Sequence, residues 1–233
     1  MSESLPVVLI PGLLLSWRMY APQLSGLWSR GGVMVANHTQ ADSMEAIARG
    51  ILAAAPSHFA LVGLSMGGYV SFEILRQAPE RVARVALLDT AARADTPEVV
   101  AARRAQMALA SSGRFPEVVD TLFTRLVHPD RHHDRELRSL VRLMGEEVGV
   151  EGYLRQQTAN IGRIDSRTSL ARVRCPTLML VGDSDVLTPP ERATEIAQGI
   201  PGAEMVVVPR CGHLSTLEHP QAVNEALAAW LRR

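Results

Sequence analysis

Short apolar runs and longer amphipathic segments alternate along the 233-residue chain. The apolar runs are bounded by turn residues and lack polar alternation, which is typical of strands covered by helices on both faces of a parallel sheet. Six runs have this form, at residues 5–10, 33–36, 59–62, 85–88, 177–181 and 205–208. The pattern therefore predicts a mostly parallel sheet of about six strands.

Helical periodicity fills the intervals between these runs. The predicted helices cover residues 21–28, 43–54, 66–77, 190–199 and 220–231, and Asp42 or Ser43 is suited to cap the second of them. Repeated strand–helix alternation requires right-handed crossovers, so it predicts a doubly wound α/β fold. Between residues 90 and 174 no strand candidate occurs, and an unstructured loop of that length would be improbable. We therefore expect an Arg-rich helical insertion between the fourth and fifth strands.

Composition narrows the function. The 24 basic and 24 acidic residues give a formal net charge of zero, so no field draws nucleic acid or anionic lipid to the chain. Every basic residue is Arg, which excludes a P-loop Lys and a Schiff-base Lys. The two cysteines, Cys175 and Cys211, are too few for a disulfide scaffold or a structural zinc site. We expect both to be buried and reduced, with no metal bound.

The beginning of the chain bears on its location. No basic segment precedes the short apolar run between Pro6 and Pro11, so this run resembles a buried strand more than a signal peptide. No segment approaches the roughly 20 apolar residues of a membrane span. These patterns favour a cytoplasmic protein with no membrane partner.

A G-x-S-x-G motif, Gly63 to Gly67, joins the third strand directly to the helix at residues 66–77. In this strand–turn–helix setting the flanking glycines allow a sharp turn that exposes the serine hydroxyl above the sheet edge. The motif predicts Ser65 as a nucleophile whose developing anion lies near a helix N-terminus. The alternative is a tight glycine-rich turn with an incidental serine.

A serine nucleophile needs a base and an acid behind it. His213 lies between the sixth strand and the last helix, at the carboxyl edge where parallel sheets bind ligands. Asp185 follows the fifth strand at the same edge, and Asp183 and Asp89 are alternatives. The order Ser65, Asp185, His213 is that of a G-x-S-x-G hydrolase.

A tetrahedral intermediate also requires two backbone N–H donors. One is expected from Met66, which follows the nucleophile. The other is expected from Leu13, beside the permissive Gly12 in the loop after the first strand.

Four motifs carry a family resemblance: the GLSMGG turn, RMYAPQ after the first strand, G-x-x-D-x-x-x-P at residues 182–189, and GHLSTLEHP. With them the chain resembles the α/β-hydrolase superfamily over essentially its full length, and within it small bacterial carboxylesterases and 3-oxoadipate enol-lactonase-like hydrolases. The resemblance implies the same triad and donors, no cofactor and a small-molecule substrate. It also implies a helical cap (residues 91–174) on a core of residues 1–90 and 175–233. Related dehalogenases and epoxide hydrolases use Asp at the elbow, so Ser65 argues against both.

Two departures from the family pattern are visible. Relatives often have His-Gly in the oxyanion loop, where this chain has Pro11 and Gly12. Relatives also usually begin with an antiparallel hairpin, for which too few residues precede Leu5. We therefore expect a sheet without that hairpin, and a sheet of eight strands would contradict this.

The leading hypothesis is hydrolysis of a small carboxylic ester or lactone through an acyl-enzyme. Alternatives with the same triad are cleavage of a carbon–carbon bond in a ring-cleavage product and cleavage of a thioester; a non-catalytic binding protein is the alternative from another class. Arginines of the insertion could face inward and pair with a substrate carboxylate, or form a solvated surface. They are Arg103, Arg104, Arg125, Arg142, Arg155 and Arg163.

Overall fold

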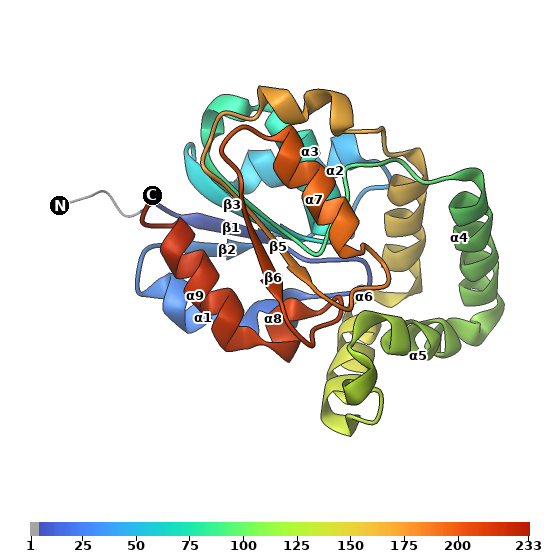
Figure 1. Cartoon of the computed structure of the whole chain (residues 1–233). Helices are drawn as coiled ribbons and strands as arrows, with labels where there is room; N and C mark the ends of the chain where they lie inside the picture. The colour runs from blue at the N-terminus through green and yellow to red at the C-terminus, as the bar shows by residue number, and fades with distance from the viewer. Residues whose placement is uncertain (1–4) are drawn as a thin grey trace.

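A single six-stranded sheet forms the centre of the protein in the computed structural model, which describes residues 5–233 (Figure 1). The strand order is β2-β1-β3-β4-β5-β6, and every neighbouring pair is parallel. The strands are β1 (Val7–Ile10), β2 (Val33–Val35), β3 (Phe59–Leu64), β4 (Val82–Leu88), β5 (Thr177–Gly182) and β6 (Glu204–Val208). All six predicted strands are present in one parallel sheet, so the predicted α/β-hydrolase fold is confirmed. Within the described residues no hairpin precedes β1.

Two helical layers enclose the sheet (Figure 1). One face carries α2 (Met44–Ala54), α3 (Met66–Gln77) and α7 (Pro190–Gly199); the other carries α1 (Ala21–Trp28), the short α8 (Ser215–Glu218) and α9 (Pro220–Trp230). The five predicted helices are all observed, within a residue at their ends. Ser43 caps α2, because its side chain accepts a hydrogen bond from the Ala46 N–H.

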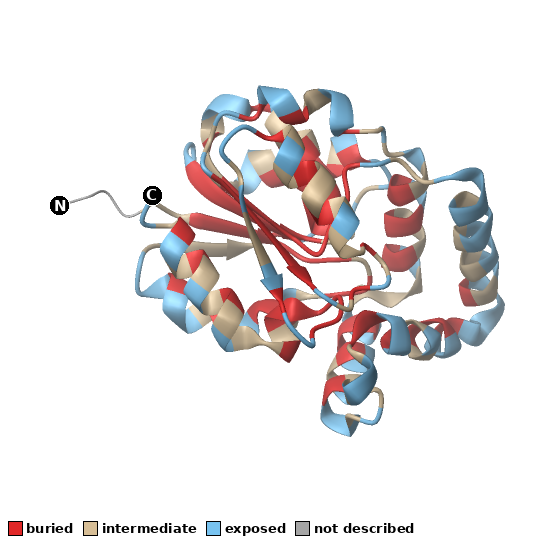
Figure 2. Ribbon diagram, in the orientation of Figure 1, coloured by how far each residue is buried: buried red, intermediate tan, exposed pale blue. Residues whose placement is uncertain are grey.

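The core lies on both faces of the sheet because successive strand side chains point in opposite directions. Val62 of β3 packs in the cluster that includes Leu227 of α9, whereas its neighbour Leu61 packs with Val70 of α3. Each such buried side chain stabilises the fold by about 1.5–3 kcal/mol. The edge strands β2 and β6 are less covered, which the colouring of Figure 2 shows.

Three helices stand beyond the carboxyl ends of the strands, between β4 and β5 (Figure 1). They are α4 (Pro97–Leu109), α5 (Phe115–Leu126) and α6 (Arg135–Gly162). We call residues 91–174 the helical insertion. Gly149 interrupts α6 with φ 68° and ψ 170°, a conformation that only glycine adopts without strain.

Short turns of 3₁₀ or π geometry connect these elements. They occupy Trp17–Tyr20, Pro79–Arg81, Ala110–Arg114, Pro129–Arg131 and Arg167–Arg172. None of the helices formed by residues 5–233 combines the length and the apolar character that a membrane span requires.

The topology places a crevice at one edge of the sheet. The chain moves from β1 outward to β2 and then crosses back to β3 on the other side of β1. Open α/β sheets bind ligands beside the carboxyl ends of strands at such a switch point. The loop after β1 and the turn after β3, which carry Leu13 and Ser65, therefore meet where a ligand is expected.

Candidate active site

Ser65 occupies the sharp turn between β3 and α3. Its backbone has φ 55° and ψ −115°, which is strained for a residue with a side chain. The turn is held on both sides, because the Ser65 N–H donates to the Leu88 carbonyl at 3.0 Å and the Thr90 hydroxyl donates to the Ser65 carbonyl at 2.8 Å. The side chain is half-buried at the start of a helix, as the sequence motif predicts for an elbow.

The glycines of the motif are required by close packing around the turn. A Cβ on Gly63 would lie 2.3 Å from the Gly67 carbonyl oxygen, and a Cβ on Gly67 would lie 2.1 Å from the Ile10 carbonyl oxygen. Both contacts are far below van der Waals distance and involve backbone atoms that cannot rotate away. Side chains at these positions would push α3 away from the end of β1 and so displace Ser65.

His213 is fixed in the loop between β6 and α8. The N–H groups of His213 and Leu214 both donate to the Leu126 carbonyl at the end of α5, at 2.9 and 3.0 Å. The imidazole is 2% exposed, and its Nδ1 lies 2.7 Å from Asp185 Oδ2. The helical insertion therefore contributes directly to the position of this histidine.

Asp185 is the carboxylate that reaches His213. Its Oδ1 accepts from the backbone N–H groups of Leu187 and Thr188 at 2.8 and 3.0 Å, and its Oδ2 accepts from the Thr188 hydroxyl at 2.7 Å. Asp183, by contrast, is exposed and accepts from the Cys211 N–H at 3.2 Å. The structure thus brings Asp185, and not Asp183, against the imidazole.

Asp89, the other alternative, is fully buried behind this pair. Its Oδ1 accepts from the Gly182 N–H at 3.0 Å, and its Oδ2 lies 2.5 Å from the Ser215 hydroxyl. Both partners are close in the chain to Asp185 and His213. Asp89 therefore braces the two loops that carry them.

The loop after β1 presents backbone donors beside Ser65. Leu13 and Met66 line the same cavity as Ser65, and no hydrogen bond within residues 5–233 engages the N–H of either residue. The next residue, Leu14, has φ 60°, and its N–H donates to Gln156 Oε1 at 3.1 Å. Both predicted donors, Leu13 in this loop and Met66 after Ser65, thus have backbone N–H groups without a partner in the described part of the chain.

One cavity of about 330 Å³ joins these groups. Ser65, Met66 and Leu13 form part of its wall on the sheet side, and His213 with Thr188 forms another. Residues of α4 and α5 line it from the insertion. The volume is near the lower limit of ordinary small-molecule sites, about 300 Å³, so the cavity suits a small ligand.

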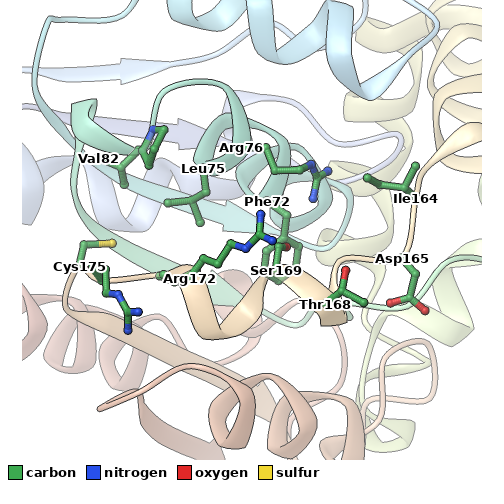
Figure 3. A pocket seen from close by; sticks show the side chains of 13 residues that line it. Phe72, Leu75, Arg76, Val82, Ile164, Asp165, Thr168, Ser169, Arg172 and Cys175 are labelled. Atoms are coloured by element: carbon green, nitrogen blue, oxygen red, sulfur yellow. The ribbon is translucent and has the colours of Figure 1, made fainter.

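A second cavity of about 640 Å³ lies between the C-terminal part of α3 and the turn Arg167–Arg172 (Figure 3). Phe72, Leu75 and Arg172 face it, and it shares no lining residue with the cavity around Ser65. Its larger volume does not make it the reaction site, because neither Ser65 nor His213 lines it. Cys175 borders this cavity and is only half-buried, which corrects the expectation that both cysteines are buried; both are free thiols.

Burial and mutual charge shift the pKa values of the buried groups. Burial opposes protonation of His213, but the charge and hydrogen bond of Asp185 outweigh it and raise the pKa of His213 above its usual value. Burial also acts against the charged form of Asp185, yet His213 and Thr188 hold the pKa of that carboxyl below its usual value. Burial, with the nearby Asp185 charge, raises the pKa of Asp89 to about 8. Asp185 is therefore the ionised partner of His213, whereas burial favours the protonated form of Asp89.

Four supporting side chains were not identified from the sequence. Thr188 lies within the G-x-x-D-x-x-x-P motif, and Glu218 lies within GHLSTLEHP, where it accepts from the Gly212 N–H at 2.9 Å. Their presence inside recognised motifs was the available signal. His38 and Gln156 meet only in the folded chain: His38 Nε2 lies 3.0 Å from the Gly12 carbonyl oxygen and 2.9 Å from Gln156 Nε2. No local sequence pattern predicts the contact between His38 and Gln156.

The fold and this cavity define a hydrolase built on an α/β sheet. The chain belongs to the alpha/beta hydrolase family, whose model matches residues 7–226. Similarity of sequence extends to pimeloyl-[acyl-carrier protein] methyl ester esterase of Nitrosomonas europaea, 26% identical over 77% of this chain and 74% of that protein. It also extends to 2-hydroxy-6-oxononadienedioate/2-hydroxy-6-oxononatrienedioate hydrolase of Burkholderia vietnamiensis, 24% identical over 88% of this chain and 74% of that protein.

Solved structures agree with this assignment. A thermophilic esterase from Thermogutta terrifontis, with malate bound, superposes with a TM-score of 0.89 and 30% identity, covering 98% of this chain and 89% of that one. The enol-lactonase from Burkholderia xenovorans superposes with a TM-score of 0.89 and 24% identity, covering 100% and 93%. The second likeness is one of fold alone. The predicted superfamily and the predicted hydrolase class are confirmed.

Proposed function

We propose that the chain hydrolyses a small carboxylic ester or lactone, with Ser65 as nucleophile, His213 as base and Asp185 as the acid. The observation that carries this proposal is the 2.7 Å contact between His213 Nδ1 and Asp185 Oδ2, in a buried pair whose histidine shares one cavity with Ser65. The elbow geometry of Ser65 and the free N–H groups of Leu13 and Met66 support it. The esterase relatives agree with it.

The acylation step follows from these positions. The Ser65 hydroxyl gives its proton to His213 Nε2 while its oxygen bonds to the carbonyl carbon of the substrate. The Leu13 and Met66 N–H groups donate to the resulting oxyanion, and Asp185 stabilises the imidazolium. The C–O bond to the leaving group then breaks, and His213 returns its proton to the departing oxygen. For a lactone the departing oxygen stays attached to the acyl chain.

Deacylation repeats this sequence with water. Water gives a proton to His213 and attacks the acyl carbon, the same donors hold the second oxyanion, and the proton returns to the Ser65 oxygen. The products are a carboxylic acid and the regenerated enzyme. None of these steps requires a metal or an organic cofactor.

We further infer that residues 91–174 act as a cap on a core of residues 1–90 and 175–233. Residues of α4 and α5, such as Val99, Leu122 and Leu126, line the cavity around Ser65. These side chains replace water with apolar surface above the nucleophile. Exclusion of water strengthens the hydrogen bonds that form to the oxyanion.

The test is hydrolysis of p-nitrophenyl acetate, butyrate and octanoate by the wild type, Ser65→Ala and Ser112→Ala. Ser112 is an exposed serine of the insertion that does not line the cavity, so its variant is the matched control. We expect turnover in the wild type and the control and none above background in Ser65→Ala. The cavity volume predicts that butyrate is preferred to octanoate. Equal rates in all three proteins would refute Ser65 as the nucleophile.

Cleavage of a carbon–carbon bond in a ring-cleavage product is the second candidate. Its support is the similarity to a hydrolase that is named for a dienedioate substrate. A vinylogous diketone carrying a terminal carboxylate, assayed beside the p-nitrophenyl esters, separates the two candidates. Turnover of the diketone at a higher kcat/KM than any ester would replace the leading proposal with this one.

A further inference from the structure

The cavity between α3 and the turn Arg167–Arg172, which we call the α3 cavity, has an apolar floor. Phe72 and Leu75 of α3 line it together with Val82, the first residue of β4. Ile164 also lines it and is 58% exposed, so apolar surface continues to the rim. The volume of about 640 Å³ is within the usual range of small-molecule sites, about 300–1,000 Å³. The α3 cavity therefore offers concave apolar surface to a ligand.

Two of the charged groups around the α3 cavity are neutralised by the protein itself. Arg76 is paired with Glu73 at 2.5 Å, and another nitrogen of its guanidinium donates to the Ser166 hydroxyl at 3.1 Å. Asp165, the acidic residue of the wall, is paired with Arg167 at 2.6 Å. Both charges are therefore balanced without a ligand.

Two further arginines of the wall have no such partner. Arg172 and Arg174 line the α3 cavity, and neither forms an ion pair within residues 5–233. Figure 3 shows the Arg172 side chain extending into the cavity. Because like charges that line one cavity repel each other, an anion bound beside them lowers the electrostatic energy. The wall thus favours a ligand with a negatively charged group.

We propose that the α3 cavity binds an amphiphilic carboxylate of medium chain length, as a ligand distinct from the ester that Ser65 attacks. The carboxylate binds Arg172 and Arg174, since a guanidinium holds both carboxylate oxygens through parallel N–H···O bonds. The alkyl chain lies on the apolar floor, against Phe72 and Leu75, and each methylene that leaves water adds to the affinity. The site therefore selects molecules that carry both a charged head group and an apolar chain.

Cys175 provides a local measure of occupancy. Its free thiol is half-buried in the wall of the α3 cavity, whereas Cys211, the other free thiol, is 0% exposed. N-ethylmaleimide should therefore label the native protein at Cys175 alone. The α3 cavity shares no lining residue with the cavity around Ser65, so a molecule bound at Ser65 does not cover this thiol.

Three small molecules separate the two parts of the proposal: octanoate, 1-octanol, which has the chain without the charge, and acetate, which has the charge without the chain. The labelling rate of the wild type, followed by mass spectrometry, reports the binding of each. At ten times its Kd, octanoate should slow labelling about 10-fold, because only the unoccupied protein reacts. Octanol and acetate should need concentrations about 10-fold higher or more for the same protection. Equal protection by octanoate and octanol, or none by octanoate, would overturn the proposal.

Substitution of the arginines tests the head-group site. Arg172→Gln and Arg174→Gln should each raise the Kd of octanoate by about 10-fold, equivalent to about 1.4 kcal/mol. Arg104→Gln is the matched control and should leave the Kd unchanged, because Arg104 is an exposed arginine of α4 that lines neither cavity. Protection by octanoate that is unaltered in the double variant would contradict the proposed head-group site.

These measurements require no turnover, so they are independent of the proposed function. Labelling rates without octanoate should agree among the wild type and the arginine variants, which checks that the cavity keeps its shape. Calorimetry with octanoate on Cys175→Ser, with and without Arg172→Gln, measures the same difference in affinity without a label. A protein that hydrolyses no ester yet binds octanoate through Arg172 would contradict the proposed function and support the α3 cavity as a ligand site.

Discussion

Gln156 of α6 accepts a hydrogen bond from the backbone N–H of Leu14, which lies 142 positions earlier in the chain, at 3.1 Å. The bond is fully buried and holds the strained residue that follows Leu13. Through this bond a helix of the insertion supports the loop that we propose as the oxyanion site. The arrangement links a distant helix to the geometry of the reaction.

Removal of this bond should lower kcat. Gln156→Ala leaves the Leu14 N–H without its partner and allows the Leu13 donor to move away from the oxyanion. We expect kcat to fall about 10-fold with little change in KM, because the donor acts mainly in the transition state. Steady-state kinetics on p-nitrophenyl butyrate measure both parameters.

Thr158→Ala is the matched control for that variant, since Thr158 is exposed on the same helix and its hydroxyl donates only to the Leu154 carbonyl. Thermal unfolding of both variants checks that the fold is retained. A Gln156→Ala protein with an unchanged kcat would show that the loop keeps its geometry without this bond.

Asp185→Asn should nearly abolish activity, whereas Asp183→Asn should not. The amide cannot stabilise the His213 imidazolium, and it favours the wrong tautomer, so kcat should fall by about 10³- to 10⁴-fold. Asp183 is exposed and points to the Cys211 N–H, so its variant should retain activity within about 10-fold. Similar losses in both variants would contradict the assignment of the acid.

The pH dependence of kcat/KM should report His213. The base must be neutral to accept the Ser65 proton, so activity is lost when His213 is protonated at low pH. Because Asp185 raises the pKa of His213, the acidic limb should have its midpoint above about 6.5, the ordinary value for histidine. A profile that stays flat from pH 8 down to pH 4 would exclude His213 as the base.

Asp89 should make the wild type less stable as the pH rises. Its pKa is about 8 in the folded protein, against an ordinary value of 3.8, so between these pH values the folded state binds more protons than the unfolded state. The stability that the folded state gains from protonated Asp89 is complete below about pH 4 and is lost as the pH rises to about 8. The Asp89→Asn side chain cannot titrate and can keep both hydrogen bonds. Its amide oxygen can accept from the Gly182 N–H, and its amide N–H can donate to the Ser215 hydroxyl oxygen.

Thermal unfolding from pH 5 to pH 9 tests this difference. The Tm of Asp89→Asn minus that of the wild type should increase towards pH 8 and then level off. Each kcal/mol of difference in the free energy of unfolding corresponds to about 2–4 °C in Tm. A constant difference across the range would mean that Asp89 is already ionised in the folded protein. At pH 7 the variant should also retain hydrolytic activity within about 10-fold, since a neutral Asp89 and an asparagine present similar groups.

Much of the fold could be predicted because its signals are local. The runs that form β1, β3, β4 and β5 are continuous and apolar, as strands buried on both faces require, and Ser43 stands where a helix cap is expected. The elbow at Ser65 could also be predicted, since the glycines that the turn requires are adjacent in the sequence. Local chemistry and the final structure agree at these positions.

The supporting shell of the site could not be predicted, because its contacts join residues far apart in the chain. Nothing around Gln156 indicates that it reaches the loop after β1, and His38 follows β2 without any motif. The sequence favours Asp185 over Asp183 as the acid, but the burial that distinguishes the two residues is visible only in the structure. The pairing of Arg103 and Arg163 with Asp95 likewise follows only from how α4 and α6 pack.

The interruption of α6 at Gly149 has an evolutionary consequence. Gln156 lies on the part of α6 after the interruption, whereas the outer wall of the cavity is formed by α4 and α5. Substitutions of the apolar side chains that α4 and α5 present to the cavity can therefore alter which molecules fit without altering the bond to Leu14. A lineage could diversify its substrates by varying α4 and α5 while the reaction chemistry is inherited unchanged.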